Sequence, residues 1–371
     1  MIRLGASVLS LVALLVVSGC QAAVSGPPKA RGNTEEILVL SDSVTWAGPV
    51  GEAIRAELAQ PIRTLPSGQG AFKVRYQPLN PRFLDNVKLT PNLVFAAPVD
   101  AEGEIGDFIR ARVGEVNIEA LRSGRAEAVN VRPDLWARDQ IVVIATAGSD
   151  TALASAFRER GDALRAQFND LARTNTEQEM FARLEQTDLS DEMLERHGFR
   201  VRVQHDYVKV QDTTATASGR TGDFVRYRRV LSDSWRDFFV FAVDGVEAMP
   251  SEAELDALTN DLLRQFALGS TDTSYVQLDD QRPESTASVE VGSRPAAEKR
   301  GLWYMVNDLM GGSYVRYAVR DESTGRLYLY YGMTFAPDRS LDKRKLLRQM
   351  EVIGHSLRTR ADLASEAALD A

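Results

Sequence analysis

The residue of this chain with the most definite chemistry is Cys20, its only cysteine. It ends a Val-Ser-Gly-Cys run at 17–20, after a positive charge at Arg3 and an apolar stretch at 8–17. This order is typical of a secretory signal peptide that closes on a lipobox, which is cut just before a cysteine that receives lipid. The apolar stretch is shorter than the roughly 20 residues that a membrane span needs. We therefore predict a signal peptide at 1–19 and a lipidated Cys20; the alternative is an ordinary signal peptide with a chance cysteine.

Lipidation of Cys20 would attach the mature protein to a membrane. A diacylglycerol thioether together with an N-acyl chain such as palmitate anchors stably, whereas a single chain binds only weakly. Residues 20–34 are small and polar, include Pro27-Pro28, and predict a tether. With its one thiol used, the chain would form no disulfide.

The residue types that catalyse reactions show no spacing that predicts a site. His197, His205 and His355 have no further histidine or cysteine at metal-ligand spacing, and zinc needs three or four ligands. The sequence holds no G-x-S-x-G, P-loop or G-x-G-x-x-G motif. We therefore predict no catalytic residue, no metal and no cofactor, and structural roles for the histidines. A hydrolase with dispersed carboxylates stays open, because the separation of two carboxylates in space is not visible in a sequence.

Arginines spaced two apart on expected strands could bind anions. They alternate with apolar residues, so strands that shared one sheet would present the guanidinium groups on one face. Guanidinium binds phosphate and carboxylate, as in lipid headgroups or cell-wall polymer. The alternative is a solvated face paired with Asp and Glu of neighbouring strands, where ion pairs contribute little. The candidate anion-binding face consists of Arg200, Arg202, Arg226, Arg228, Arg316 and Arg320.

A second candidate site is an aromatic segment that leads into two glycines. Trp303 and Asn307 precede Gly311 and Gly312. Paired glycines permit positive φ or a close backbone approach, and a tryptophan adds amphipathic surface. The segment could therefore line a ligand groove. The alternative is a strand, a tight turn and a strand with the aromatic side chains in the core.

Length and charge narrow the function classes. The 371 residues include 44 Lys and Arg against 52 Asp and Glu, a net charge of −8. An acidic chain argues against nucleic-acid binding. The length leaves room for two domains.

Hydrophobic spacing predicts the elements of the first half. Short apolar or alternating runs indicate strands, and apolar residues at helical spacing indicate helices. The strands are expected at 37–40, 72–76, 93–97, 129–131 and 136–147, and the helices at 50–58 and 153–171. A turn at 132–134 predicts a hairpin, and 105–121 fits neither pattern cleanly. We assign an N-terminal domain to 35–187.

The second half is richer in strands. They are expected at 199–204, 207–210, 224–230, 238–243, 289–291, 301–305, 314–320 and 327–335. Ser251 and Glu254 predict a capping box for a helix at 251–268, and a last helix opens at Ser340. We assign a C-terminal domain to 188–360 and a disordered tail to 361–371. The predicted fold class is α+β, with antiparallel sheets and amphipathic helices packed on one face.

Several of these segments resemble one family. The matching segments are Ile37–Leu40, the Trp46-x-Gly48-Pro49-x-Gly51 helix start, Asp134–Ala137, Arg300–Trp303, Asn307-x-x-Met310-Gly311-Gly312 and Phe335–Pro337. They are similar to an uncharacterised group of envelope lipoproteins from the Bacteroidetes group and relatives, catalogued as a domain of unknown function. The resemblance runs from Glu35 to Arg358 and departs from the family at 68–70, where the family has a proline-rich segment. It implies a lipid-anchored envelope protein and brings no known activity. In such families an acidic stretch after the cysteine marks surface export; its absence favours the periplasmic side of an outer membrane.

These observations predict a non-enzymatic binding or structural component of the envelope. Its partners would be the membrane, through the anchor, and an envelope protein, cell-wall polymer or lipid headgroup, with no nucleic acid. The alternatives are an envelope hydrolase and a carrier of lipid or lipoprotein. A polar cleft with two perturbed carboxylates would favour the hydrolase. An apolar tunnel would favour the carrier, and an exposed apolar or arginine-lined face would favour the binding protein.

Overall fold

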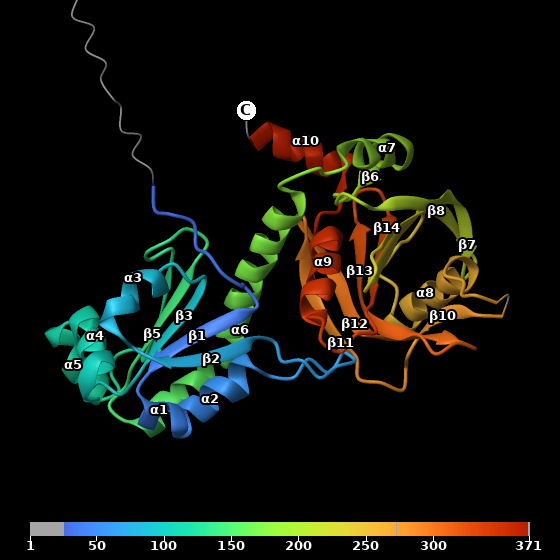
Figure 1. The fold of residues 1–371 in the computed structure, drawn as a ribbon. Helices are drawn as coiled ribbons and strands as arrows, with labels where there is room; N and C mark the ends of the chain where they lie inside the picture. The colour runs from blue at the N-terminus through green and yellow to red at the C-terminus, as the bar shows by residue number, and fades with distance from the viewer. Residues whose placement is uncertain (1–25, 272, 370–371) are drawn as a thin grey trace, which may run out of the picture.

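The computed structural model describes residues 26–271 and 273–369. The predicted signal peptide and the predicted lipidation of Cys20 lie outside the described residues. In Figure 1 the chain forms two bodies, connected by the long helix α6 (Asp150–Phe181). No helix within the described residues is both long enough and apolar enough to cross a bilayer.

The N-terminal domain is built on a five-stranded sheet in the order β2-β1-β3-β5-β4. Its strands are β1 (Glu36–Ser41), β2 (Lys73–Pro78), β3 (Asn92–Ala96), β4 (Val129–Pro133) and β5 (Ile141–Ala145). Its other helices are α1 (Ser43–Ala47), α2 (Pro49–Leu58), η1 (Pro81–Phe83), α3 (Leu84–Val87), α4 (Gly103–Val113) and α5 (Glu115–Arg122).

The strands of this sheet are mainly parallel. The pairs β1–β2, β1–β3 and β3–β5 are parallel, and β4 runs antiparallel to β5 in the predicted hairpin. Antiparallel pairing therefore describes only one pair here. The reason lies in the strands: every residue of β3 and of β5 is buried, as expected of parallel strands covered on both faces.

Helices accordingly cover both faces of the N-terminal sheet, whereas the sequence predicts helices on one face only. Ile54 of α2 and Phe157 of α6 share an apolar cluster with Val39 on one face. Ile109 of α4 shares another cluster with Phe95 on the opposite face. A strand with apolar side chains on both faces needs a cover on each side.

The C-terminal domain confirms the predicted antiparallel architecture. Its large sheet has the order β10-β12-β13-β14-β9-β8-β7, and β11 also pairs with β12. The strands are β7 (Val208–Ala217), β8 (Arg220–Val230), β9 (Trp235–Val243), β10 (Tyr275–Leu278), β11 (Ser285–Val291), β12 (Arg294–Val306), β13 (Gly311–Asp321) and β14 (Arg326–Phe335). A separate pair joins β6 (Phe199–Arg200) to β15 (Arg358–Thr359).

Helices again pack on both faces of the large sheet. Leu262 of α8 (Glu252–Phe266) shares a cluster with Tyr331, and Met350 of α9 (Lys343–His355) shares the opposite cluster with Tyr330. The predicted capping box of α8, between Ser251 and Glu254, is present. Helix α7 (Thr187–His197) begins this domain.

The predicted disordered tail forms a helix, α10 (Arg360–Leu369). The Thr359 backbone N–H donates to Asp362 at 2.7 Å, and the Asp362 N–H donates to the Thr359 hydroxyl at 3.3 Å. This reciprocal bonding caps the start of the helix. The Thr-x-x-Asp spacing at 359–362 therefore indicates a helix start, although the alanine-rich, acidic composition of the segment favours disorder.

The second half of the predicted tether at 20–34 packs on the N-terminal domain. The backbone N–H of Ala30 donates to the Arg138 carbonyl oxygen at 2.9 Å, and the Arg138 N–H donates to Pro28 at 2.8 Å. Lys29 pairs with Asp139 at 3.2 Å. The segment from Pro28 onward thus belongs to the N-terminal domain.

Candidate functional site

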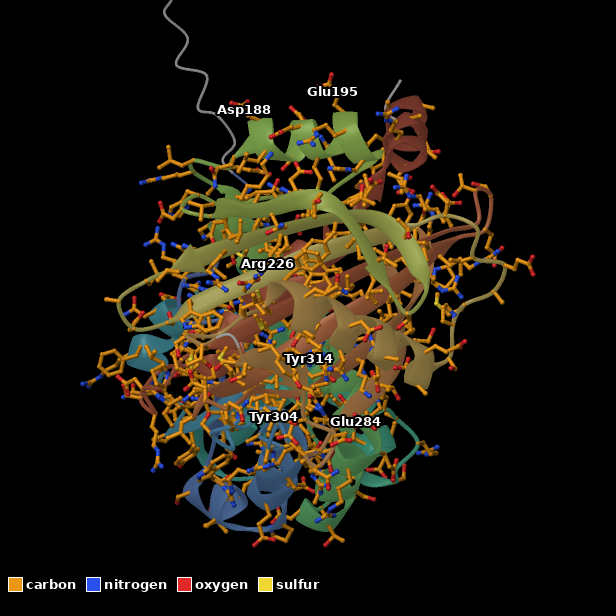
Figure 2. All side chains as sticks on the ribbon, turned by 90° about the vertical axis from the view of Figure 1, so that its right-hand side faces the viewer. Asp188, Glu195, Arg226, Glu284, Tyr304 and Tyr314 are labelled. Carbon is orange, nitrogen blue, oxygen red and sulfur yellow. The ribbon has the colours of Figure 1, made fainter. Side chains whose placement is uncertain are left out.

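The six arginines of the predicted anion-binding face do not form one surface. Arg226 and Arg228 both bind the Asp237 carboxylate at 2.7 Å. Arg226 is 3% exposed and lies among the strands in Figure 2. Arg316 is buried as well and pairs with Asp256 at 2.6 Å. Arg226 and Arg316 neutralise carboxylates from buried positions, whereas the Arg228 side chain is 33% exposed.

The other three predicted arginines also have acceptors. Arg320 donates to a backbone carbonyl oxygen at 2.8 Å. Arg200 and Arg202 lie outside the large sheet, where they pair with Asp191 at 3.3 Å and Glu185 at 2.8 Å. The ion-paired alternative describes the set better, because strand alternation alone does not tell a buried face from a solvated one.

The predicted ligand groove is a tight hairpin. Trp303 is 1% exposed, and its indole N–H donates to the Thr334 carbonyl oxygen at 3.2 Å. A Cβ added at Gly312 would overlap that same carbonyl oxygen. Asn307 turns the chain with φ of 57°, and Gly311 borders a surface cavity beside Arg339. These residues bring β12 and β13 together and line no common groove.

The histidines occupy structural surroundings. His197 lies between two carboxylates, with Nε2 at 3.0 Å from Asp212 and Nδ1 at 3.4 Å from Asp223. The His355 ring packs edge-on against Tyr317, with centroids 4.9 Å apart. Across the described part of the chain, no three His, Cys, Asp or Glu side chains are grouped so that they could hold a metal ion.

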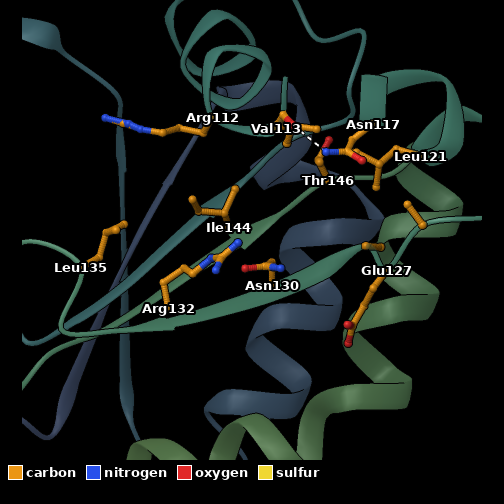
Figure 3. Close-up of a pocket in the computed structure, with 12 residues that line it drawn as sticks. Arg112, Val113, Asn117, Leu121, Glu127, Asn130, Arg132, Leu135, Ile144 and Thr146 are labelled. Carbon is orange, nitrogen blue, oxygen red and sulfur yellow. Dashed lines mark hydrogen bonds between the residues drawn. The ribbon is translucent and has the colours of Figure 1, made fainter. Parts of the chain in front are cut away.

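The strongest candidate site is a groove in the N-terminal domain that sequence reasoning missed (Figure 3). A cavity of about 440 Å³ lies between α4–α5 and the β4–β5 hairpin. Val113, Leu121, Leu135 and Ile144 give it an apolar lining. This volume is in the range of small-molecule sites, which are mostly apolar with a few placed polar groups.

The local sequence explains why the groove stays open. Gly114, with φ of 79°, ends α4 and starts α5, so that two short helices replace one long cover. Residues alternate along β4: Val129 is buried in the core, whereas Asn130 and Arg132 face the cavity. A polar edge strand beside a broken helix leaves room above Ile144 of β5, which is buried and lies at the base of the groove.

Two arginines of the groove have no carboxylate within 4.0 Å among the described residues. Arg132 points toward Ile144 and the cavity in Figure 3, while Arg112 extends along its rim. The Arg112 guanidinium lies 4.6 Å from the centre of the Phe108 ring. Neither positive charge is neutralised by a carboxylate of the described residues, so both are free to meet an anion.

A buried hydroxyl adds a directional group. Thr146, directly after β5, is 2% exposed, and its Oγ1 has no hydrogen-bond partner among the described residues. A buried polar group without a partner is costly, so a ligand atom that bonds to it is favoured. Asn117 bonds to the Val113 carbonyl oxygen through its amide N–H at 2.9 Å, which leaves its amide oxygen for a ligand.

The one acidic residue of the groove lining faces elsewhere. Glu127 points away from the cavity in Figure 3, and its carboxylate pairs with Arg160 at 2.6 Å. The cavity itself is thus positive at Arg112 and Arg132 and has an apolar floor. This arrangement suits an elongated molecule with an apolar body and an anionic head.

A second hollow lies between the domains. It has a volume of about 260 Å³ and is lined by five arginines, from α6, β12 and α9: Arg165, Arg173, Arg300, Arg344 and Arg348. Arg300 binds Glu298 through two bonds of 2.7 and 2.8 Å, and Arg344 binds Asp342 in the same bidentate way at 3.0 and 2.7 Å. These guanidinium N–H groups already donate to acceptors of the protein. We therefore interpret this arginine cluster as a contact between the domains and not as an anion-binding site.

Sequence signals for both places existed. The alternation of polar and apolar residues at 129–132 marks a strand with one open face, and Arg165, Asn169 and Arg173 are spaced by four along α6. Neither pattern shows which elements pack against these residues. That packing decides whether the residues line an open groove or form ion pairs between the domains.

The comparisons with known proteins give domains without functions. Residues 30–181 match the model of one family, described as a domain of unknown function (DUF8532), and residues 186–356 match another (DUF4837). No curated protein matches the chain. The two matches divide the chain between α6 and α7, as the fold does.

Proposed function

We propose that this protein is a lipid-anchored envelope protein that binds an amphipathic ligand in the groove beneath α4 and α5. The ligand has an apolar body and a carboxylate or phosphate head. The observation that carries the proposal is that one groove combines three features: the unneutralised guanidinium groups of Arg112 and Arg132, an apolar floor, and the Thr146 hydroxyl, which has no partner among the described residues. The role is one of binding, without catalysis.

The anchor rests on the sequence signal at Cys20 and on the resemblance to envelope lipoproteins. Acyl chains on Cys20 would hold the body at the periplasmic face of an outer membrane. There an amphipathic ligand is at hand in lipids, lipoproteins and cell-wall precursors.

The polar groups argue for a binding site over the two alternatives. Glu351 is the one carboxylate among the described residues that line the interdomain hollow. Burial raises its pKa, but the charges of Arg300 and Arg348 outweigh burial and hold the pKa at about 2. A carboxylate with that pKa is ionised at neutral pH and donates no proton. A carrier needs an enclosed apolar tunnel, whereas the groove has polar residues along one side.

Binding of octyl phosphate to the acylated protein in bilayer nanodiscs tests the groove. Trp136 lies 5.6 Å from the Arg112 guanidinium and reports on binding by fluorescence, and Trp136→Phe identifies its signal. Arg132→Gln and Thr146→Val should each weaken binding about tenfold, since a charged or buried hydrogen bond contributes roughly 1.5 kcal/mol. Arg158→Gln, at an exposed arginine of α6, is the matched control.

The result that contradicts the groove is equal affinity for all three variants, or equal affinity for octyl phosphate and octanol. Either outcome would mean that the guanidinium groups do not meet the anionic head.

A further inference from the structure

The segment before β1 fixes which side of the N-terminal domain lies nearest to Cys20. Ala30 and Pro28 bond to the backbone of Arg138 at 2.9 and 2.8 Å, and the Arg31 N–H donates to the Leu89 carbonyl oxygen at 2.7 Å. The chain thus enters the fold along the connection between β4 and β5, as Figure 1 shows. This connection is the end of the domain where the chain from Cys20 arrives.

The distance from Cys20 to that point is limited by chain length. Seven residues, from 20 to 26, separate the predicted lipid from the docked segment, and even fully extended they span at most about 25 Å. If Cys20 is acylated, as the proposed function requires, the β4–β5 connection lies within that distance of the bilayer. The rest of the N-terminal domain is oriented by the same contacts.

The groove opens at this same end. Leu135, which lines the groove and is 39% exposed, is three residues from Arg138 in the β4–β5 connection. Here the groove combines the exposed aliphatic side chain of Leu135 with the guanidinium groups of Arg112 and Arg132.

We propose that this end of the N-terminal domain docks on the leaflet that holds the anchor, and that the groove takes an anionic phospholipid of that leaflet. Arg112 and Arg132 bind the phosphate, and Leu135 enters the headgroup region. Arginines near an anionic surface are attracted to it, and aliphatic side chains favour the interface. The anchor keeps the lipid at a high effective concentration, so a weak site is occupied.

The test uses the acylated full-length protein reconstituted into vesicles of phosphatidylcholine with or without phosphatidylglycerol. Because the Cys20 sulfur is in a thioether, Leu135→Cys gives a single free thiol for an environment-sensitive dye. Val230→Cys, at an exposed valine of the C-terminal domain, is the matched control. A nitroxide on the lipid headgroup quenches dyes that lie at the surface.

We expect the dye at Leu135 to lose at least half of its emission in phosphatidylglycerol vesicles and the dye at Val230 to lose less than a tenth. Arg112→Gln with Arg132→Gln should remove most of the difference. Equal quenching at both positions, in protein that sediments with the vesicles, overturns the docking and leaves the anchor in place. A Cys20→Ser protein that still sediments with vesicles of phosphatidylcholine alone overturns the anchor, and the docking with it.

Discussion

At the scale of the residue, the protonation of His355 depends on groups from four elements. Burial against α9 and β13 lowers its pKa to about 4, and the positive charges of Arg173 on α6 and Arg300 on β12 act in the same direction. Glu351 and Glu298 oppose them but do not prevail. The folded protein therefore keeps this imidazole neutral at a pH where an unfolded histidine is charged.

The stability of the fold should fall as the pH drops from 6.5 toward 4. In that window the unfolded chain binds a proton at His355 that the folded chain does not, so acid favours unfolding. Between pH 7 and pH 5.5 the loss from this one group is about 1 kcal/mol. Urea unfolding at the two pH values should show this loss in the wild type and much less of it in His355→Gln.

His205→Gln is the control, since His205 lies in a loop away from α9. The interpretation of His355 is wrong if its replacement leaves the pH dependence of the wild type unchanged. Glu351, with a pKa of about 2 against 4.5 in an unfolded chain, adds a loss of the same sign only below about pH 4.5. Measurements at pH 5.5 therefore report mainly on the histidine.

At the scale of the element, Gly161 shows how packing overrides helix propensity. It lies in the middle of α6, where alanine stabilises an exposed helix by about 1 kcal/mol relative to glycine. In the structure, α2 passes so close that a Cβ at Gly161 would overlap the side chain of Glu57. The glycine is thus a contact point between two helices.

We expect Gly161→Ala to give no stabilisation in the wild-type chain. In a Glu57→Ala background the overlap is gone, and the same change should stabilise the protein by about 0.5–1 kcal/mol. Thermal unfolding of the four proteins of this cycle measures the coupling. A similar gain from Gly161→Ala in both backgrounds would show that α2 accommodates the methyl group.

The elements that the sequence predicts well are those whose signals are local. Ser251 and Glu254 cap α8 through contacts within one turn, and the hairpin at 132–134 needs only neighbouring strands. The parallel order of β1, β3 and β5 was missed because it depends on crossovers of dozens of residues. Gly114 can be identified in the sequence as a helix breaker. That it separates two helices beside an open groove depends on the sheet against which they pack.

At the scale of the whole molecule, the two domains meet through groups that are far apart in the chain. Arg348 of α9 binds Glu35, just before β1, at 2.5 and 3.1 Å, and Arg348 also bonds to Asn169 of α6 at 3.1 Å. Glu35 is 1% exposed. No spacing in the sequence indicates an ion pair between residues this far apart. The contact between the domains could therefore not be predicted.

Removing one partner of this ion pair should loosen the junction between the domains. Glu35→Gln removes the nearest carboxylate of the buried Arg348 and leaves only Glu351, at 3.8 Å, and breaking a buried pair costs about 3–5 kcal/mol. Replacing both, as Glu35→Leu with Arg348→Met, should recover most of that loss, because well-packed apolar groups often substitute for a buried pair. The readout is the rate of proteolysis at the exposed linker residue Leu184, together with thermal unfolding.

The exposed pair of Asp100 and Arg122 provides the comparison, since Asp100→Asn should leave both readouts unchanged. If Glu35→Gln is cut at Leu184 no faster than Asp100→Asn, the ion pair does not hold the domains. If the double variant is as labile as Glu35→Gln, the loss comes from the shape of the site and not from the unpaired charge. The pattern expected here, one labile variant between two stable ones, assigns the junction to electrostatic pairing across 313 residues of chain.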